Sequence, residues 1–188
     1  MARLCAPVDS VMRRRMAVWY FAYGSNMQSA TLRGRRGVVY TRALAARVPG
    51  WRLVLDKPPL VSVGHGFANI VPDPAAEVLG VLFELSVADF EHIELTEGVR
   101  IGNYDAVDVE AWPFAAAAAV RARSLSSARR DPSLRPSRRY MSLLIEGAVE
   151  HGLPAAYVDT LRAMPAVEES AEAVALRPFI DRAMRRGG

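Results

Sequence analysis

The feature that most constrains the fold is an apolar run that leads directly into a polar loop. Val18 to Ala22 reads Val-Trp-Tyr-Phe-Ala, and Tyr23 to Met27 reads Tyr-Gly-Ser-Asn-Met. A short run rich in β-branched and aromatic residues is typical of a buried strand. Gly24 lets the chain turn without a Cβ, and successive amides beside Ser25 and Asn26 can bind a carboxylate or an oxyanion. The pattern predicts a strand that ends at a ligand-binding loop, although Gly-Ser-Asn is also a common turn.

Composition limits the class of protein. With 188 residues, 51% of them hydrophobic, the chain is long enough for one domain with a sizeable core. The net charge is +4, but 23 of the 24 basic residues are arginines scattered along the chain, without the stacking aromatics of a nucleic-acid interface. No apolar run approaches the roughly 20 residues that span a bilayer. We therefore expect neither nucleic acid nor membrane as a partner, and the oligomeric state stays open.

The distribution of predicted elements favours an α+β fold. Residues 1–16 are expected to be a disordered leader, 17–165 the folded domain, and 166–188 a helical tail. Cys5, the only cysteine, excludes an intrachain disulfide and fits a cytoplasmic protein. Strands dominate the first two thirds and helices the last third, without an alternating βαβ rhythm. Strands are expected at about 17–23, 37–40, 43–55, 67–71, 78–85, 103–112 and 115–124, with a turn at Pro49-Gly50 dividing the run 43–55. Helices are expected at 28–33, 87–94, 137–150 and 155–163.

Two further motifs follow the loop in a definite order. Glu97 to Tyr104 reads Glu-Gly-Val-Arg-Ile-Gly-Asn-Tyr, and Pro136 to Tyr140 reads Pro-Ser-Arg-Arg-Tyr. Together with Gly80 to Glu84 and Gly147 to Pro154, these motifs make residues 17–165 resemble the gamma-glutamylcyclotransferase-like family. The resemblance implies a small mixed β-barrel with surrounding helices and a cavity at one end.

The resemblance also implies a reaction and its residues. The substrate would be a γ-glutamyl amide whose own α-amine attacks the γ-carbonyl, which releases 5-oxoproline and an amine or amino acid without a metal or cofactor. Glu97 matches the family's catalytic glutamate, a general acid/base. The backbone loop that binds substrate corresponds to Tyr23, Gly24, Ser25, Asn26 and Met27. Tyr140 matches a tyrosine whose hydroxyl reaches the substrate.

Other interpretations of these residues stay open. Glu97 alone could be a solvated glutamate at a helix end, and Tyr140 could be a core aromatic. A non-catalytic barrel that binds a γ-glutamyl metabolite or a protein partner would keep the same pocket. Segments 57–66 and 126–136 are expected to select the substrate, and arginines 135, 138 and 139 suit an anionic leaving group or a solvated loop equally well.

Overall fold

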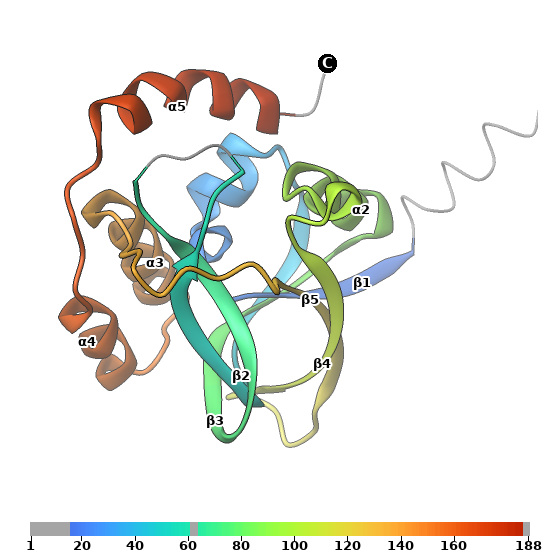
Figure 1. The fold of residues 1–188 in the computed structure, drawn as a ribbon. Helices are drawn as coiled ribbons and strands as arrows, with labels where there is room; N and C mark the ends of the chain where they lie inside the picture. Colours follow the sequence, from blue (N-terminus) through green and yellow to red (C-terminus); the bar gives the residue numbers. More distant parts are fainter. Residues whose placement is uncertain (1–15, 61–63, 186–188) are drawn as a thin grey trace, which may run out of the picture.

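A closed barrel of five strands forms the centre of the computed structural model, which describes residues 16–60 and 64–185 (Figure 1). This confirms the expected α+β barrel. Most of the expected leader, residues 1–15, lies outside the described residues. The strands are β1 (Ala17–Ala22), β2 (Tyr40–Lys57), β3 (Phe67–Ser86), β4 (Asp105–Pro113) and β5 (Val120–Ser126).

The strands close the barrel in the order β1-β3-β2-β4-β5. Neighbouring pairs are antiparallel, except that β1 meets β5 in parallel at Tyr20 and Arg123. The inward-facing residues of the strands form one apolar core, in which Phe21, Ile70 and Phe83 are completely buried. Because the last residues of β1 are buried, the loop that follows them starts inside the molecule.

A long hairpin of β2 and β3 replaces several shorter predicted strands. The sequence predicts a break at Pro49-Gly50 and separate strands at 67–71 and 78–85. Instead, β2 and β3 pair from Tyr40 to Lys57, with the register shifting between Pro49 and Trp51. Gly50 has φ of 80°, a conformation that favours glycine, so the irregularity is absorbed within the strand as a bulge.

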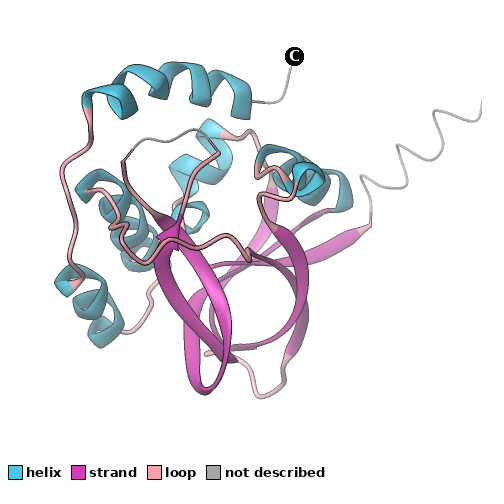
Figure 2. Ribbon diagram, in the orientation of Figure 1, coloured by secondary structure: helices cyan, strands magenta, loops and turns pink. Residues whose placement is uncertain are grey.

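Short helical turns and longer helices pack against the barrel (Figure 2). Ser86 and Ser137 cap α2 and α3, since each hydroxyl accepts a hydrogen bond from a backbone amide three residues later. These two helix starts are confirmed. The helical elements are η1 (Ser25–Met27), η2 (Ala30–Arg35), α2 (Val87–Thr96), η3 (Val99–Ile101), α3 (Arg138–Glu150), α4 (Ala155–Ala163) and α5 (Ala171–Met184).

One predicted strand begins later than expected. The segment 115–124 is predicted as a strand, but β5 starts only at Val120, and Ala115 to Ala119 form the connection from β4. The chain must reverse direction after Pro113, and small alanine side chains offer little cross-strand packing to extend the pairing.

The short helix predicted at 28–33 is also displaced, because η2 is a single π-helical turn at Ala30–Arg35.

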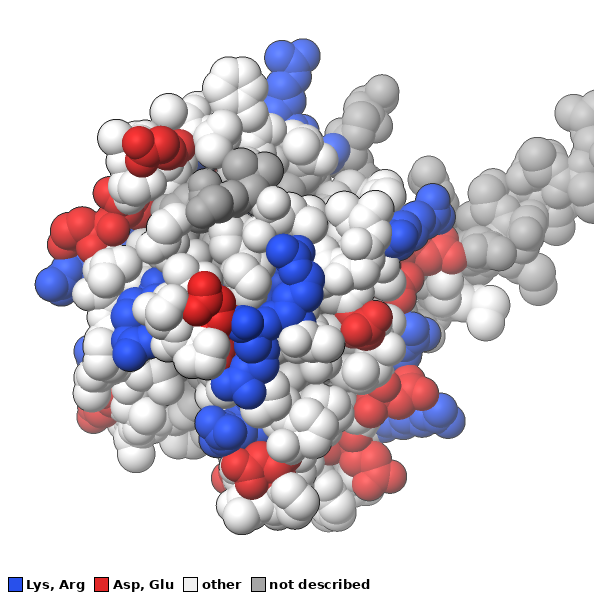
Figure 3. All heavy atoms as spheres, viewed as in Figure 1, with Lys and Arg blue, Asp and Glu red and all other residues white. Residues whose placement is uncertain are grey.

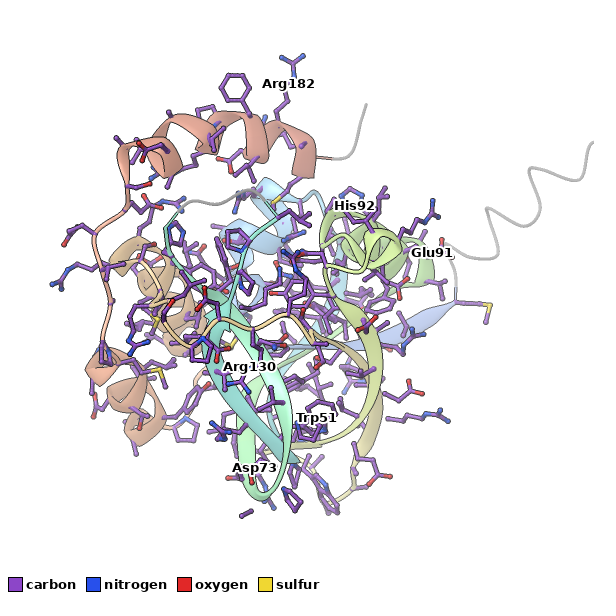
Figure 4. The ribbon with its side chains drawn as sticks, viewed as in Figure 1. Trp51, Asp73, Glu91, His92, Arg130 and Arg182 are labelled. Atoms are coloured by element: carbon purple, nitrogen blue, oxygen red, sulfur yellow. The ribbon has the colours of Figure 1, made fainter. Side chains whose placement is uncertain are left out.

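The helices gather at one end and one side of the barrel. Figure 1 shows α5 crossing the end where α2 and the turns after β1 lie, whereas α3 and α4 flank one side. Trp51 and Asp73 mark the hairpin, away from the end that carries His92 and Arg182 (Figure 4). Within the described part of the chain, no helix combines the length and apolar character that crossing a bilayer requires.

Charges on the visible face are interspersed rather than segregated by sign (Figure 3). Several of them form ion pairs, such as Arg52 with Asp73 at 2.9 Å and Arg130 with Asp56 at 2.6 Å. Paired surface charges give little net field for attracting a polyanion. The expected lack of nucleic-acid binding stays a prediction.

Candidate active site

A cavity of about 460 Å³ lies at the end of the barrel that α5 covers. Its walls come from segments far apart in the sequence: the loop after β1, the ends of η2, β2 and α2, the starts of β3 and α3, and α5. Tyr23, Gly24, Ser25, Asn26, Glu97 and Tyr140 all line it. The structure thus brings together all but one of the predicted site residues in a single cavity.

The exception is Met27, whose side chain is completely buried and does not line the cavity. It lies beside Gly147 of α3, where an added Cβ would stand 2.7 Å from the Met27 Cβ. Met27 therefore anchors the loop to α3 rather than facing the cavity. At the other end of the loop, a Cβ on Gly24 would stand 3.2 Å from the Tyr140 hydroxyl.

Glu97 follows α2 and is held by side chains of two other segments. Asn26 Nδ2 donates to Glu97 Oε1 at 3.2 Å, and the guanidinium of Arg36 donates to the same oxygen. Only 19% of the Glu97 side chain is exposed. The alternative of a freely solvated glutamate at a helix end is therefore wrong for this structure.

Asn26 presents a second polar atom beside the carboxylate. Its Nδ2 also donates to the Tyr20 hydroxyl at 3.0 Å, whereas its Oδ1 is buried and has no hydrogen-bond partner among the described residues. Buried polar atoms are usually satisfied, and an exception in a cavity is a natural contact for a ligand. Oδ1 of Asn26 and the carboxylate of Glu97 can together accept hydrogen bonds from one ammonium group.

The backbone of Ala68 ties two tyrosines to the wall of the cavity. Its amide donates to the Tyr140 hydroxyl at 3.1 Å, and its carbonyl accepts from the Tyr104 hydroxyl at 2.9 Å. The Tyr140 oxygen accepts from Ala68, and the backbone and side chain of Ser25 lie within hydrogen-bonding reach of the same hydroxyl. The hydroxyl of Tyr23, by contrast, donates to the carbonyl of Leu125 at 2.6 Å, so this side chain fastens the loop to β5.

Burial keeps these phenols protonated. It raises the pKa of Tyr140 to about 12, against the opposing effect of the hydrogen bond from the Ala68 amide. Burial likewise raises the pKa of Tyr20, Tyr23 and Tyr104 above the usual value. Near neutral pH the cavity therefore offers neutral hydroxyl groups rather than phenolates.

Two residues of the cavity, Arg36 and Lys57, were not predicted from the sequence. Arg36 belongs to an arginine cluster formed with Arg33 and Arg35, and nothing in the sequence distinguishes it from these two. Only 2% of Arg36 is exposed, however. Lys57 is 2% exposed at the end of β2, and its status as the only lysine in the chain is a sequence signal that could have drawn attention to it. His65 is also buried and lines the cavity.

Of the three arginines near Tyr140, one reaches the cavity. Arg139 lines it, whereas Arg135 donates to carbonyls of its own loop and Arg138 pairs with Glu168 on the surface. The solvated-loop interpretation fits Arg135 and Arg138.

No group of three or more His, Cys, Asp or Glu side chains among residues 16–60 and 64–185 is arranged to hold a metal ion.

The fold and the cavity define a closed-barrel α+β protein with a fixed carboxylate beside a strand-end loop. The AIG2-like family model matches residues 77–161. A gamma-glutamyl cyclotransferase of Aspergillus oryzae is 31% identical over 172 residues, which cover 79% of this chain and 62% of the relative. The gamma-glutamylcyclotransferase of Bos taurus is 29% identical over 150 residues, 77% of each chain.

Solved structures agree with these sequence matches. An uncharacterised protein from Homo sapiens superposes with a TM-score of 0.72 at 25% identity, over 87% of this chain and 98% of that one. A structure titled gamma-glutamyl cyclotransferase gives the same TM-score at 24% identity and supports the fold. The family model, these relatives and this structure all support a gamma-glutamylcyclotransferase-like family for this chain. It spans about 62% of the length of the Aspergillus oryzae relative.

Proposed function

We propose that the protein cleaves a γ-glutamyl amide by intramolecular cyclisation, with Glu97 as general acid and base. The observation that carries this proposal is the contact of Asn26 and Arg36 with Glu97 inside the cavity. This contact places two groups side by side: the loop, which is suited to binding the substrate, and the Glu97 carboxylate, which is suited to transferring the substrate's proton. The names of the Aspergillus oryzae and Bos taurus relatives, both gamma-glutamyl cyclotransferases, support the same reaction.

The first step places the substrate's α-ammonium at Glu97. The carboxylate of Glu97 and Oδ1 of Asn26 accept its hydrogen bonds, and Glu97 then removes one proton. The free amine attacks the γ-carbonyl carbon within the same molecule, which forms a five-membered ring. Holding the two groups in position contributes about 7–11 kcal/mol in favourable intramolecular reactions.

The second step breaks the amide bond. The tetrahedral intermediate carries negative charge on the former carbonyl oxygen, and the Tyr140 hydroxyl and the amides near Ser25 are suited to donate to it. Glu97 returns its proton to the leaving nitrogen as the carbon–nitrogen bond breaks. The ring nitrogen still carries two hydrogens and a positive charge, and it gives one proton to Glu97, from which the proton passes to the released amine or to solvent. The products are 5-oxoproline and a free amine or amino acid.

The test is 5-oxoproline release from a panel of γ-glutamyl dipeptides and γ-glutamyl amines, measured by mass spectrometry. We expect release by the wild type and a loss of at least about a hundredfold in Glu97→Gln, since the proton shuttle is removed. Glu94→Gln is the matched control, because Glu94 lies on α2 but pairs with Arg123 outside the cavity. Binding of these compounds without release would favour the non-catalytic alternative, and full activity of Glu97→Gln would contradict the mechanism.

A further inference from the structure

Lys57 is an exceptional residue in this chain. It is the only lysine beside 23 arginines, and it is almost completely buried at the end of β2, where it lines the cavity. Lysine is rarely buried unless its charge is paired. An anion is therefore expected near the Lys57 ammonium group.

Within the described part of the chain, the partners in direct contact with Lys57 are neutral. Nζ of Lys57 donates to Oδ1 of Asn103 and lies 4.4 Å from the centre of the Tyr104 ring. Arg129 donates to the same Oδ1 at 2.9 Å. Among residues 16–60 and 64–185, no carboxylate oxygen lies within 4.0 Å of either cation. Two cations therefore converge on one uncharged oxygen.

This arrangement favours a bound anion. Burial lowers the pKa of Lys57 to about 8; Glu97 opposes this shift and Arg129 adds to it. The ammonium is thus charged at neutral pH but poorly solvated and close to a like charge. A carboxylate beside it would relieve both penalties and form charge-assisted hydrogen bonds.

Asn103 connects this pair of cations to the reaction centre. Its Nδ2 donates to the backbone carbonyl of Glu97 at 2.8 Å, and its Oδ1 faces Lys57. We propose that Lys57 binds a carboxylate of the substrate while Glu97 receives the α-ammonium, and that Arg129, which does not line the cavity, supports Lys57 through Asn103. This inference rests on the proposed function and adds to it the substrate group that the cavity recognises. The carboxylate belongs either to the glutamyl group itself or to a leaving amino acid.

Kinetics separate these two sources. γ-Glutamyl-alanine and γ-glutamyl-ethylamide differ only by the carboxylate of the leaving group. If Lys57 binds that carboxylate, the wild type prefers γ-glutamyl-alanine, and Lys57→Met reduces the ratio of the two kcat/KM values about 10- to 100-fold. If Lys57 binds the glutamyl α-carboxylate, Lys57→Met raises KM for both substrates by a similar factor. Unchanged KM values for both substrates would overturn the inference.

A second variant guards against misfolding of the first. Arg129 is only partly buried, so Arg129→Met is expected to fold, and it should shift the same KM values in the same direction by a smaller factor. Arg130→Met is its matched control, since Arg130 pairs with Asp56 at 2.6 Å whereas Arg129 donates to Asn103. Equal kinetics for these two arginine variants would show that Arg129 does not support Lys57.

A binding measurement is independent of turnover. Because the chain has one lysine, protein labelled with [13C]lysine gives one lysine side-chain signal in NMR spectra. Titrating Glu97→Gln with γ-glutamyl-alanine or 5-oxoproline should move this signal, whereas the uncharged 5-oxoproline amide should not. Failure of the wild type to release 5-oxoproline would refute the proposed reaction but leave this titration interpretable. A signal unmoved by either carboxylate would overturn the role of Lys57.

Discussion

Arg36 and Glu97 form an ion pair inside the cavity, although 61 residues separate them in the sequence. Only 3% of the Arg36 side chain is exposed, and its guanidinium also donates to Thr96 Oγ1 at 2.5 Å. A guanidinium group presents its donors in a planar fork, so two acceptors on adjacent residues define the direction of the contact. The pair holds the Glu97 carboxylate against Asn26 before a substrate arrives.

This pairing predicts that Arg36 positions Glu97. In Arg36→Met the carboxylate loses its fixed partner, and we expect kcat/KM to fall about 10- to 100-fold because small displacements of a reacting group are costly. Removing one member of a buried pair should also lower the free energy of unfolding by about 3 kcal/mol. Steady-state kinetics and urea unfolding measure the two effects.

Arg33→Met serves as the control for Arg36. Arg33 belongs to the same arginine cluster but is exposed and lies over the Tyr40 ring. Its replacement should change kcat/KM by less than about threefold. Equal activities for the two variants would show that Glu97 does not need Arg36 for its position.

Contact between α3 and the loop after β1 predicts a steric effect at Gly147. An added Cβ would lie 2.6 Å from the Gln28 amide nitrogen and 2.7 Å from Met27. We expect Gly147→Ala to lower the free energy of unfolding by about 1–3 kcal/mol through overpacking, and to reduce activity by moving the loop. Gly34→Ala is the control, since a Cβ there meets nothing within 4 Å; thermal unfolding of both variants should differ clearly.

Lys57 predicts a specific dependence of stability on pH. Its pKa is lowered from 10.5 to about 8 in the folded protein, first by burial and further by Arg129, against the attraction of Glu97. Between these pH values the unfolded chain binds more protons than the folded one, so this residue makes the free energy of unfolding rise with pH. Urea unfolding at about pH 7 and about pH 10 should show a larger gain for the wild type than for Lys57→Met. The same rise in the free energy of unfolding in both proteins would mean that the Lys57 side chain is solvated in the folded state.

Ion pairs between α5 and its surroundings predict how firmly this helix covers the cavity. Glu169, just before α5, pairs with Arg177 on the helix and lies 4.0 Å from Arg139. We expect Glu169→Gln to speed tryptic cleavage within α5 about fivefold, as a loss of roughly 1 kcal/mol would do. Glu168→Gln is the control, because Glu168 pairs with the exposed Arg138 on the surface. Cleavage at equal rates would mean that other contacts hold the helix.

Local chemistry made several parts of the fold predictable. Ser86 and Ser137 begin their helices as expected, since a serine cap depends on residues only three positions away. The meeting of the loop at Asn26 with Glu97 was implied by the resemblance of the motifs to the gamma-glutamylcyclotransferase-like family. Both predictions use information carried by short segments.

The parts that were missed depend on distant packing. Pro49-Gly50 resembles a turn, but pairing with β3 on both sides keeps β2 continuous. Arg36 looks like any other arginine of its cluster until α2 brings Glu97 and Thr96 to it. The helical tail was predicted from its local residue pattern. That pattern carries no information about what the helix contacts, so it could not show that α5 lines the cavity.

The Tyr140 hydroxyl is expected to stabilise the oxyanion that forms on the substrate during the reaction. Its hydroxyl accepts from the Ala68 amide at 3.1 Å, and its pKa of about 12 keeps it protonated, so it can donate to the developing negative charge. Tyr140→Phe should lower kcat about 100- to 1000-fold, as the loss of one such donor does in other enzymes. The expected effect on KM is smaller, because the charge appears only in the transition state.

A second tyrosine separates catalysis from stability. Tyr157 of α4 donates to the Leu79 carbonyl at 3.1 Å and does not line the cavity. Each Tyr→Phe change removes one hydroxyl from a hydrogen bond, which costs about 1 kcal/mol of folding free energy. We expect similar losses of stability for Tyr140→Phe and Tyr157→Phe but a large loss of kcat only for Tyr140→Phe. If both retained the wild-type kcat, the hydroxyl of Tyr140 would serve packing alone, and the amides near Ser25 would have to stabilise the oxyanion without it.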